Sequence, residues 1–428
     1  MKKIYVVLIT IVCVVIGICG TMLAGGKLDK KENSDEQTTE QCTELGQKNI
    51  EAFADGEGEG NTDSRMFETT EAEKTTESTE DARQILVDDT LEGMTLHDKV
   101  CQMMFVTPEE LTGEDTVTVA GDVTKKALEK YPVGGIVYFA KNLETKDQVK
   151  DMISNSQSYS SIGLFISTDE EGGTVNRLMD TVGTTYIDSM YNYKDDGTDK
   201  AYENAHTIAQ DMSELGFNVD FAPVADVWSN PDNTVIGRRA YSDDYAQAAE
   251  LVGSAVKGFR DGGVMCTLKH FPGHGDTAED SHYSSAYVNR TKDQIMVDEM
   301  QTFRSGIDAG AELVMVGHLI VPDIDELPAT LSYKIATEML RGDMGFDGIA
   351  ITDSLEMESI ADNYGVGDSA VMAVQAGMDM LLQPADPTVA IDAIVAAVES
   401  GDIKETRIDE SVRRILTLKA ERGLLEKK

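Results

Sequence analysis

The sequence predicts a barrel of eight parallel strands, each followed by helical segments, within one α/β domain. Two observations support this fold class. Eight short runs rich in Val, Ile and Leu alternate with longer segments whose apolar residues recur at helical spacing. Nearly every run is apolar at its start and polar at its end, which is typical of barrel strands whose carboxyl ends meet at one functional face. A doubly wound open sheet is the alternative for the same alternation.

The eight runs follow one another through the last four fifths of the chain. They read VCQMMFVT (100–107), VGGIVYFA (133–140), GLFISTDE (163–170), VDFAPVAD (219–226), VMCTLKHF (264–271), LVMVGH (313–318), GIAITDS (348–354) and MDMLLQP (378–384). Intervening segments such as DYAQAAELVGSAVKGFRDGG have a helical pattern and end in Gly, a common helix stop. Cys101 and Cys266 fall in two of the runs, so we expect both to be buried free thiols on core strands.

Two segments are predicted to precede the domain, which we place at residues 86–428. Residues 1–26 contain an uncharged run after Lys2 and Lys3 that is long enough to cross a bilayer, so we expect a signal anchor or transmembrane segment. A cleaved signal peptide is the alternative. Residues 27–85 are rich in Thr and Glu, with 17 acidic against 7 basic residues up to position 83, and predict a disordered acidic linker.

The charge pattern restricts location and partners. Because the positive residues precede the apolar run, we expect the domain outside the cell, held at the membrane or secreted if the first segment is cleaved. The formal net charge of −40 argues against a nucleic-acid partner, since phosphates require a basic surface. We expect a monomer.

Charged residues at the ends of several runs are candidates for one pocket. Asp169 ends the third run, Lys269 and His270 end the fifth, and Asp353 ends the seventh. The carboxyl ends of barrel strands converge, so these side chains should face one another. Polar strand ends that simply meet water are the simpler interpretation of any one of them.

Three kinds of chemistry could use such a pocket. A metal site could use His270, His274 and His282 with Asp280, although the segment is rich in Gly and Lys269 is a poor neighbour for a cation. A serine nucleophile lacks its usual G-x-S-x-G motif. Glycoside hydrolysis needs an anionic carboxylate and a proton donor, which Asp353 and the Asp280–His282 pair can supply.

Several segments together identify a resemblance. KHFPGHGDT followed by DSH, TDEEGGTVNR (168–177), DFAPVADVWSNPDNTVIGRRAY (220–241), PATLSYKIATEMLRGDMGFDGIAITDSLEM (328–357) and AGMDMLLQPAD (376–386) resemble the family 3 glycoside hydrolases, in their β-N-acetylhexosaminidase (N-acetylglucosaminidase) branch. The segments occur in family order from about Leu91 to the end of the chain. After DSH the family usually continues with Leu-Pro, whereas this chain has Tyr283 and Ser284.

The resemblance implies roles for matching positions. Asp353 would be the nucleophile, and His282 the general acid/base paired with Asp280. His274 would support the loop, and His318 would border the pocket. The residues that would bind the terminal sugar are Asp169, Arg177, Arg239, Lys269 and His270.

The implied activity is that of a retaining exo-β-N-acetylglucosaminidase acting on cell-wall or related glycans that end in β-linked N-acetylglucosamine. No metal or organic cofactor is implied. The alternatives are a β-glucosidase, a phosphorolytic family member, a non-catalytic sugar-binding protein and, more distantly, a metal-dependent hydrolase.

Overall fold

Eight parallel strands form the central sheet of the computed structural model, which describes residues 80–277 and 286–426. The strands are β1 (Met104–Val106), β2 (Gly135–Val137), β3 (Phe165–Thr168), β4 (Val219–Asp220), β5 (Met265–Phe271), β7 (Leu313–Val316), β9 (Ile349–Thr352) and β10 (Leu381–Leu382). Their order is β10-β1-β2-β3-β4-β5-β7-β9, which follows the chain around a ring. A parallel bridge between Ile351 and Met380 joins the two ends. The sheet is thus a nearly closed barrel, as predicted, and the open doubly wound alternative is wrong.

Each of the eight predicted runs contains one barrel strand, but the first run begins in a helix. Helix α2 (Leu96–Gln102) starts at Thr95, whose hydroxyl accepts from the backbone of Asp98 while the Asp98 carboxylate bonds back to Thr95. This capping box outweighs the strand-like composition, so the strand placement of Cys101 was wrong. Cys266 lies on β5 as expected, and both cysteines are buried and free.

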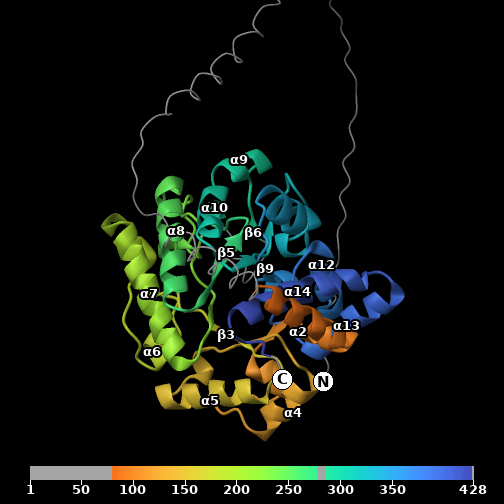
Figure 1. Cartoon of the computed structure of the whole chain (residues 1–428). Coiled ribbons are helices and arrows are strands. Elements are labelled where there is room, and N and C mark those ends of the chain that lie inside the picture. Colours follow the sequence, from red (N-terminus) through yellow and green to blue (C-terminus); the bar gives the residue numbers. More distant parts are fainter. Residues whose placement is uncertain (1–79, 278–285, 427–428) are drawn as a thin grey trace, which may run out of the picture. The chain divides into compact units, whose positions relative to one another are not determined.

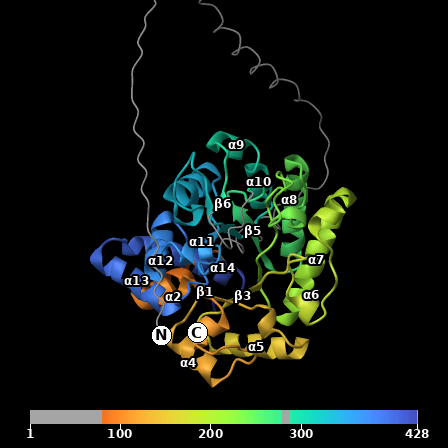
Figure 2. The ribbon, with the colours of Figure 1, turned by 180° about the vertical axis from the view of Figure 1, so that it is seen from behind.

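Helices connect successive strands and surround the barrel (Figures 1 and 2). After α2 they are α3 (Pro108–Thr112), α4 (Asp122–Lys130), α5 (Lys146–Tyr159), α6 (Leu178–Thr181), α7 (Thr198–Leu215), α8 (Tyr245–Asp261), α9 (Lys292–Val297), α10 (Met300–Asp308), α11 (Glu358–Ala361), α12 (Val366–Ala376), α13 (Pro387–Ser400) and α14 (Glu405–Glu421). The described residues also form four 3₁₀ segments, which are η1 (Ala140–Asn142), η2 (Met190–Asp196), η3 (Gly237–Arg239) and η4 (Ala329–Leu331), and η5 (Lys334–Asp343) is a π-helix. A small parallel pair, β6 (Ala286–Tyr287) and β8 (Leu319–Ile320), lies apart from the barrel sheet.

The pair α7 and α8 shows why these segments form helices and where they pack. In α7 small and apolar residues recur at Ala201, Ala205, Ile208 and Met212, and all of these are buried. Figure 1 shows the two helices side by side on one flank of the barrel. Gly258 of α8 allows this approach, because a Cβ there would lie 2.4 Å from a carbonyl oxygen of α7.

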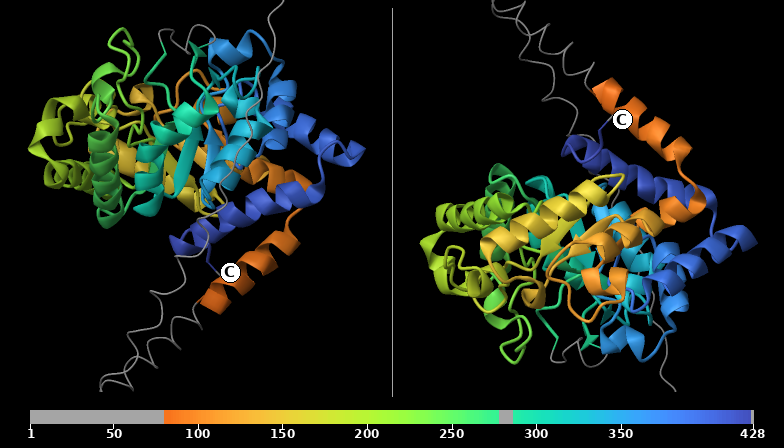
Figure 3. Two further views of the ribbon diagram at one scale, coloured as in Figure 1. Left: turned by 90° about the horizontal axis from the view of Figure 1, so that it is seen from above. Right: turned by 90° about the horizontal axis from the view of Figure 1, so that it is seen from below.

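A helix over residues 80–93 precedes α2 and lies alongside α14 (Figure 3). Its buried residues Val87 and Leu91 are four positions apart and form one apolar stripe. Residues 80–85, which we placed at the end of the linker, therefore belong to a helix. The predicted membrane segment, residues 1–26, and the remainder of the linker lie outside the described residues. Within the part of the chain that the structure describes, no helix is long and apolar enough to span a membrane.

Candidate active site

A cavity of about 380 Å³ lies at the carboxyl ends of the barrel strands. All six predicted site residues within the described part of the chain line it, namely Asp169, Arg177, Arg239, Lys269, His270 and Asp353. They come from five places in the sequence that are up to 184 positions apart (353 − 169). The strand-end pattern and the family resemblance predicted that these six residues share one pocket, and in the structure they do.

A buried group of charges forms one wall of the cavity. Glu171 has no exposed side-chain surface, and its carboxylate accepts from Arg239 at 2.9 Å (Nε) and 2.8 Å (Nη2). Lys269 Nζ lies 2.6 Å from Glu171 Oε1 and 2.8 Å from Asp169 Oδ1. Burial alone would raise the pKa of Glu171, but the charges of Arg239 and Lys269 lower it to about 2. Glu171 is therefore ionised at neutral pH and holds both cations in place.

Arg177 is positioned from behind by a second buried carboxylate. The backbone N–H groups of Arg177, Leu178 and Met179 donate to Glu170 at 2.6, 2.7 and 3.1 Å. Because these bonds hold the start of α6, they determine where the Arg177 side chain begins. Its Nη2 lies 3.7 Å from Asp169 Oδ2, and its Nε has no hydrogen-bond partner among the described residues. Arg177 also lines the cavity, so its guanidinium can donate to a ligand there.

Asp353 directly follows β9 and is held by its own backbone. Its N–H donates to the Val316 carbonyl at 2.9 Å, and its Oδ1 accepts from the Ser354 N–H at 2.8 Å. His318 lies behind this turn rather than at the border of the cavity, so that placement was wrong. His318 is 1% exposed, and its Nε2 is 2.8 Å from the Ser354 carbonyl oxygen, which can only accept. The ring therefore supports the turn that carries Asp353.

The two histidines of KHFPGHG have different surroundings. His270 lines the cavity, and its Nδ1 lies 2.7 Å from the buried carboxylate of Asp226. His274 is 2% exposed and does not line the cavity; its Nδ1 is 2.8 Å from the Thr277 hydroxyl. Burial and the neighbouring His270 lower the pKa of His274 to about 4, so its ring is neutral at pH 7. These contacts fit the predicted loop-supporting role of His274.

Asp280 and His282 lie outside the described residues, so the predicted acid/base pair stays a prediction. Within the described ranges, no group of three or more His, Cys, Asp or Glu side chains is arranged to hold a metal ion. The proposed metal set included His282, and only a chelation experiment can test it.

Sequence reasoning missed two carboxylates and an apolar wall. Glu171 directly follows the third apolar run and Asp226 ends the fourth, but neither was predicted to belong to the site. A signal for both was present, because buried Arg, Lys and His side chains need acidic partners. The wall could not be read from the sequence, since its members come from six separate segments: Phe139, Val175, Phe221, Met315, Met357 and Leu382.

Comparison with known proteins supports the same class. Residues 95–418 match the glycosyl hydrolase family 3 N terminal domain, and the chain belongs to this family. Beta-hexosaminidase A of Pseudoalteromonas piscicida is 32% identical over 322 residues, which cover 68% of this chain and 54% of that protein. A beta-hexosaminidase of Methylobacillus flagellatus is 34% identical, covering 65% of this chain and 79% of its own length.

A solved structure has the same fold. The family 3 β-N-acetylglucosaminidase of Paenibacillus sp. str. FPU-7 is 40% identical, with a TM-score of 0.73 over 78% of this chain and 64% of that one. The present chain thus spans about half to two thirds of the length of these two relatives, from Pseudoalteromonas and Paenibacillus.

Proposed function

We propose that the chain is a retaining exo-β-N-acetylglucosaminidase that releases terminal β-linked N-acetylglucosamine from peptidoglycan-derived or related glycans. The observation that carries this proposal is that Asp353 lines one cavity with the predicted sugar-binding side chains. A retaining glycosidase needs such a carboxylate beside groups that hold the sugar hydroxyls. The names of the relatives, beta-hexosaminidase and β-N-acetylglucosaminidase, support the choice of sugar.

In this mechanism Asp353 is the nucleophile. Its carboxylate attacks the anomeric carbon while the bond from that carbon to the aglycone oxygen breaks, which forms a glycosyl ester on Asp353. His282, oriented by Asp280, gives a proton to the leaving oxygen and later takes one from the attacking water. The two displacements together retain the anomeric configuration. An imidazole acid also avoids a second carboxylate close to Asp353.

The cavity offers matching surfaces for the sugar. Asp169, Arg177, Arg239, Lys269 and His270 supply charged and polar groups for its hydroxyls. The apolar wall, which includes Phe139 and Met357, suits the methyl group of an acetamido substituent. A glucoside would leave that surface unfilled, so the acetamido sugar is the better substrate.

The place of action is part of the proposal. Residues 1–26 would anchor the chain in the cell membrane, and residues 27–79 would hold the domain away from it on the extracellular side. Cell-wall fragments would then be within reach, and the enzyme would act as a monomer.

Substrate panels test the activity. The full chain is assayed on 4-nitrophenyl β-N-acetylglucosaminide and on the β-glucoside, with and without EDTA and inorganic phosphate. We expect cleavage of the acetamido sugar alone, unaffected by EDTA. A sugar 1-phosphate product would indicate phosphorolysis, inhibition by EDTA a metal site, and cleavage of the glucoside alone a β-glucosidase.

A trapping experiment tests the covalent step. A 5-fluoro N-acetylglucosaminyl donor slows breakdown of the glycosyl-enzyme, so its mass should remain on the peptide that contains Asp353. A label on another acidic residue would overturn the assignment of the nucleophile.

A further inference from the structure

Asp226 is a buried carboxylate that contacts His270 on β5 and the backbone of His274 just after this strand. It follows β4 and is 1% exposed. One oxygen, Oδ1, accepts from the His274 N–H at 2.7 Å and from the His270 N–H at 3.2 Å. The other, Oδ2, lies 3.1 Å from the His270 N–H and 2.7 Å from Nδ1 of the His270 ring.

The carboxylate of Asp226 is ionised. Burial alone would raise its pKa, but the charge interaction and hydrogen bond with His270, together with contacts from His274, lower it. An ionised carboxylate can only accept hydrogen bonds. At 2.7 Å from it, Nδ1 of His270 must therefore carry a hydrogen.

The contact with Asp226 determines which nitrogen of the His270 ring faces the cavity. Its side chain is 9% exposed and lines the cavity, so the edge that faces a ligand is the one away from Asp226. When the ring is uncharged and donates through Nδ1, the other nitrogen, Nε2, is an acceptor, whereas in the doubly protonated ring both nitrogens are donors. The nearby His274 ring, with its centroid at 5.8 Å, is neutral at pH 7 and adds no charge.

Acceptors are few on this side of the cavity. Arg177, Arg239 and Lys269 are pure donors, and Glu171 uses both of its oxygens on Arg239 and Lys269. Asp169 is a further acceptor, but its Oδ1 is 2.8 Å from Lys269 Nζ and its Oδ2 is 3.7 Å from Arg177 Nη2. A sugar hydroxyl donates one hydrogen bond besides those it accepts, so it requires an acceptor in addition to the cations.

We propose that Asp226 is a positioning residue that fixes the Nδ1–H tautomer of His270 and thereby presents Nε2 as the acceptor for one hydroxyl of the bound sugar. The hydroxyl contact rests on the proposed function, whereas the tautomer does not. Asp226 itself does not line the cavity and acts through His270 alone.

The substitution Asp226→Asn should exchange the donor and acceptor nitrogens of the His270 ring, while the side chain at position 226 keeps its size and shape. The backbone N–H groups of His270 and His274 can pair only with the amide oxygen, so the amide NH₂ must face the His270 ring. Nδ1 then becomes an acceptor, and the hydrogen moves to Nε2. A sugar hydroxyl that donates to Nε2 in the native protein would meet a second donor instead.

Nitrogen-15 NMR of the histidine rings reads the tautomer directly. The chain has six histidines, and the His270 signals are identified by their loss in His270→Gln. We expect the Nδ1–H pattern for His270 in the native protein and the Nε2–H pattern in Asp226→Asn. A native Nε2–H pattern, or the pattern of a doubly protonated ring at the pH of the kinetic assays, would overturn the proposal, and this measurement requires no activity.

Kinetics tests the consequence. For Asp226→Asn we expect KM to rise roughly 10- to 100-fold with kcat nearly unchanged, the size expected when a hydrogen bond is lost and a donor is left unpaired. Among 3-, 4- and 6-deoxy substrates, one should show the same KM in native and variant protein. In a His270→Gln background, Asp226→Asn should have little further effect.

Two outcomes contradict the proposal in the kinetic experiment. An equal loss with and without the His270 ring would show that Asp226 only supports the backbone. A loss on all deoxy substrates alike would show that no single hydroxyl depends on Nε2. If N-acetylglucosaminides are not cleaved at all, the proposed function fails, and the NMR result still decides the tautomer.

Discussion

The two ends of the barrel use the same residue types in different ways. At the carboxyl ends of the strands, Arg239 and Lys269 share Glu171 yet still line an open cavity. At the amino-terminal ends, the buried carboxylate of Asp379 accepts from Arg341, from Arg414 at 3.2 Å and from the Ser411 hydroxyl at 2.7 Å. One end offers charged groups to a ligand, whereas the other uses them to join helices to strands.

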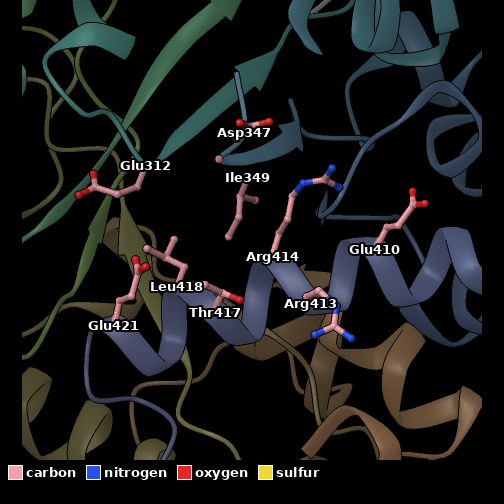
Figure 4. Close-up of a pocket in the computed structure, with 10 residues that line it drawn as sticks. Glu312, Asp347, Ile349, Glu410, Arg413, Arg414, Thr417, Leu418 and Glu421 are labelled. Atoms are coloured by element: carbon pink, nitrogen blue, oxygen red, sulfur yellow. The ribbon is translucent and has the colours of Figure 1, made fainter. Parts of the chain in front are cut away.

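A second cavity lies at this amino-terminal end (Figure 4). Figure 4 shows Arg414 and Glu421 extending from α14 toward the side of the cavity on which Ile349 and Glu312 lie. Glu312 also pairs with Arg260 and Arg422, which are outside the cavity. Charge around a cavity therefore does not identify an active site by itself; what matters is whether the charged groups retain capacity for a ligand.

The largest expected effect is a loss of activity without a loss of stability, caused by a substitution at the carboxyl-terminal end of the barrel. Asp353→Asn should lower kcat by roughly 10⁴-fold or more, because it removes the proposed nucleophile. The melting temperature should change little, since the Oδ1 contact with the Ser354 N–H can be kept by the amide oxygen. Initial rates and thermal unfolding measure the two quantities. Retained turnover in the folded variant would move the nucleophile to another residue.

The next largest effect is a loss of stability without a loss of activity, caused by a substitution at the amino-terminal end of the barrel. Asp379→Asn leaves Arg341, Arg407 and Arg414 without their buried anion and should cost about 3–5 kcal/mol in the free energy of unfolding. The kcat of the folded fraction should be unchanged. Asp347→Asn, an exposed change at the same end, is the matched control and should stay within about 0.5 kcal/mol. Denaturant titration with parallel activity assays would decide.

Glu171→Gln should lower both the activity and the stability. It therefore tests whether one residue at the functional end of the barrel can serve ligand binding and folding together. Loss of the anion leaves Lys269 and Arg239 poorly held, and we expect kcat/KM to fall roughly 10²- to 10³-fold. In the native protein the pKa of Glu171 is about 2, below its ordinary value of 4.5. Its stabilising effect is therefore complete above pH 4.5 and disappears as the pH falls toward 2. Unfolding measured across this window should show a smaller decline in the variant.

The smallest effect concerns Lys419, which is fully buried near the amino-terminal ends. Its Nζ lies 2.8 Å from Gln102 Oε1 and 5.0 Å from the centre of the Phe165 ring. Burial lowers its pKa from 10.5 to about 7. Native stability should thus decrease as the pH falls from 10.5 to 7 and then level off, because the unfolded chain gains the proton first.

Replacing this amine tests the same point. Lys419→Met should raise the free energy of unfolding by about 1–2 kcal/mol at pH 6, net of the lost partner of Gln102, with a smaller gain near pH 10. Activity should be unchanged. A gain that does not vary with pH would show that Lys419 is charged in the folded protein throughout.

Much of the fold could be predicted because its signals are local. Each of the eight apolar runs contains a barrel strand, and their polar ends mark the functional face. The two errors arose where one local signal outweighed another. The capping box at Thr95 extended a helix into the first run, although the composition favoured a strand. The apolar stripe through Val87 and Leu91 formed a helix where the composition indicated a linker. The placement of Asp353 in the cavity followed from the strand-end rule and the family resemblance together.

By itself, the sequence determined the order of strands and helices and the end of the barrel at which chemistry is possible, because periodicity, caps and strand polarity act over a few residues. Only the tertiary structure decided which charges meet. Glu171 pairs with Arg239, 68 positions away, and Asp226 with His270, 44 positions away. Such pairs form because burial removes water from several strand ends at once, and each buried charge must then find its partner among residues that the barrel, not the chain, makes neighbours.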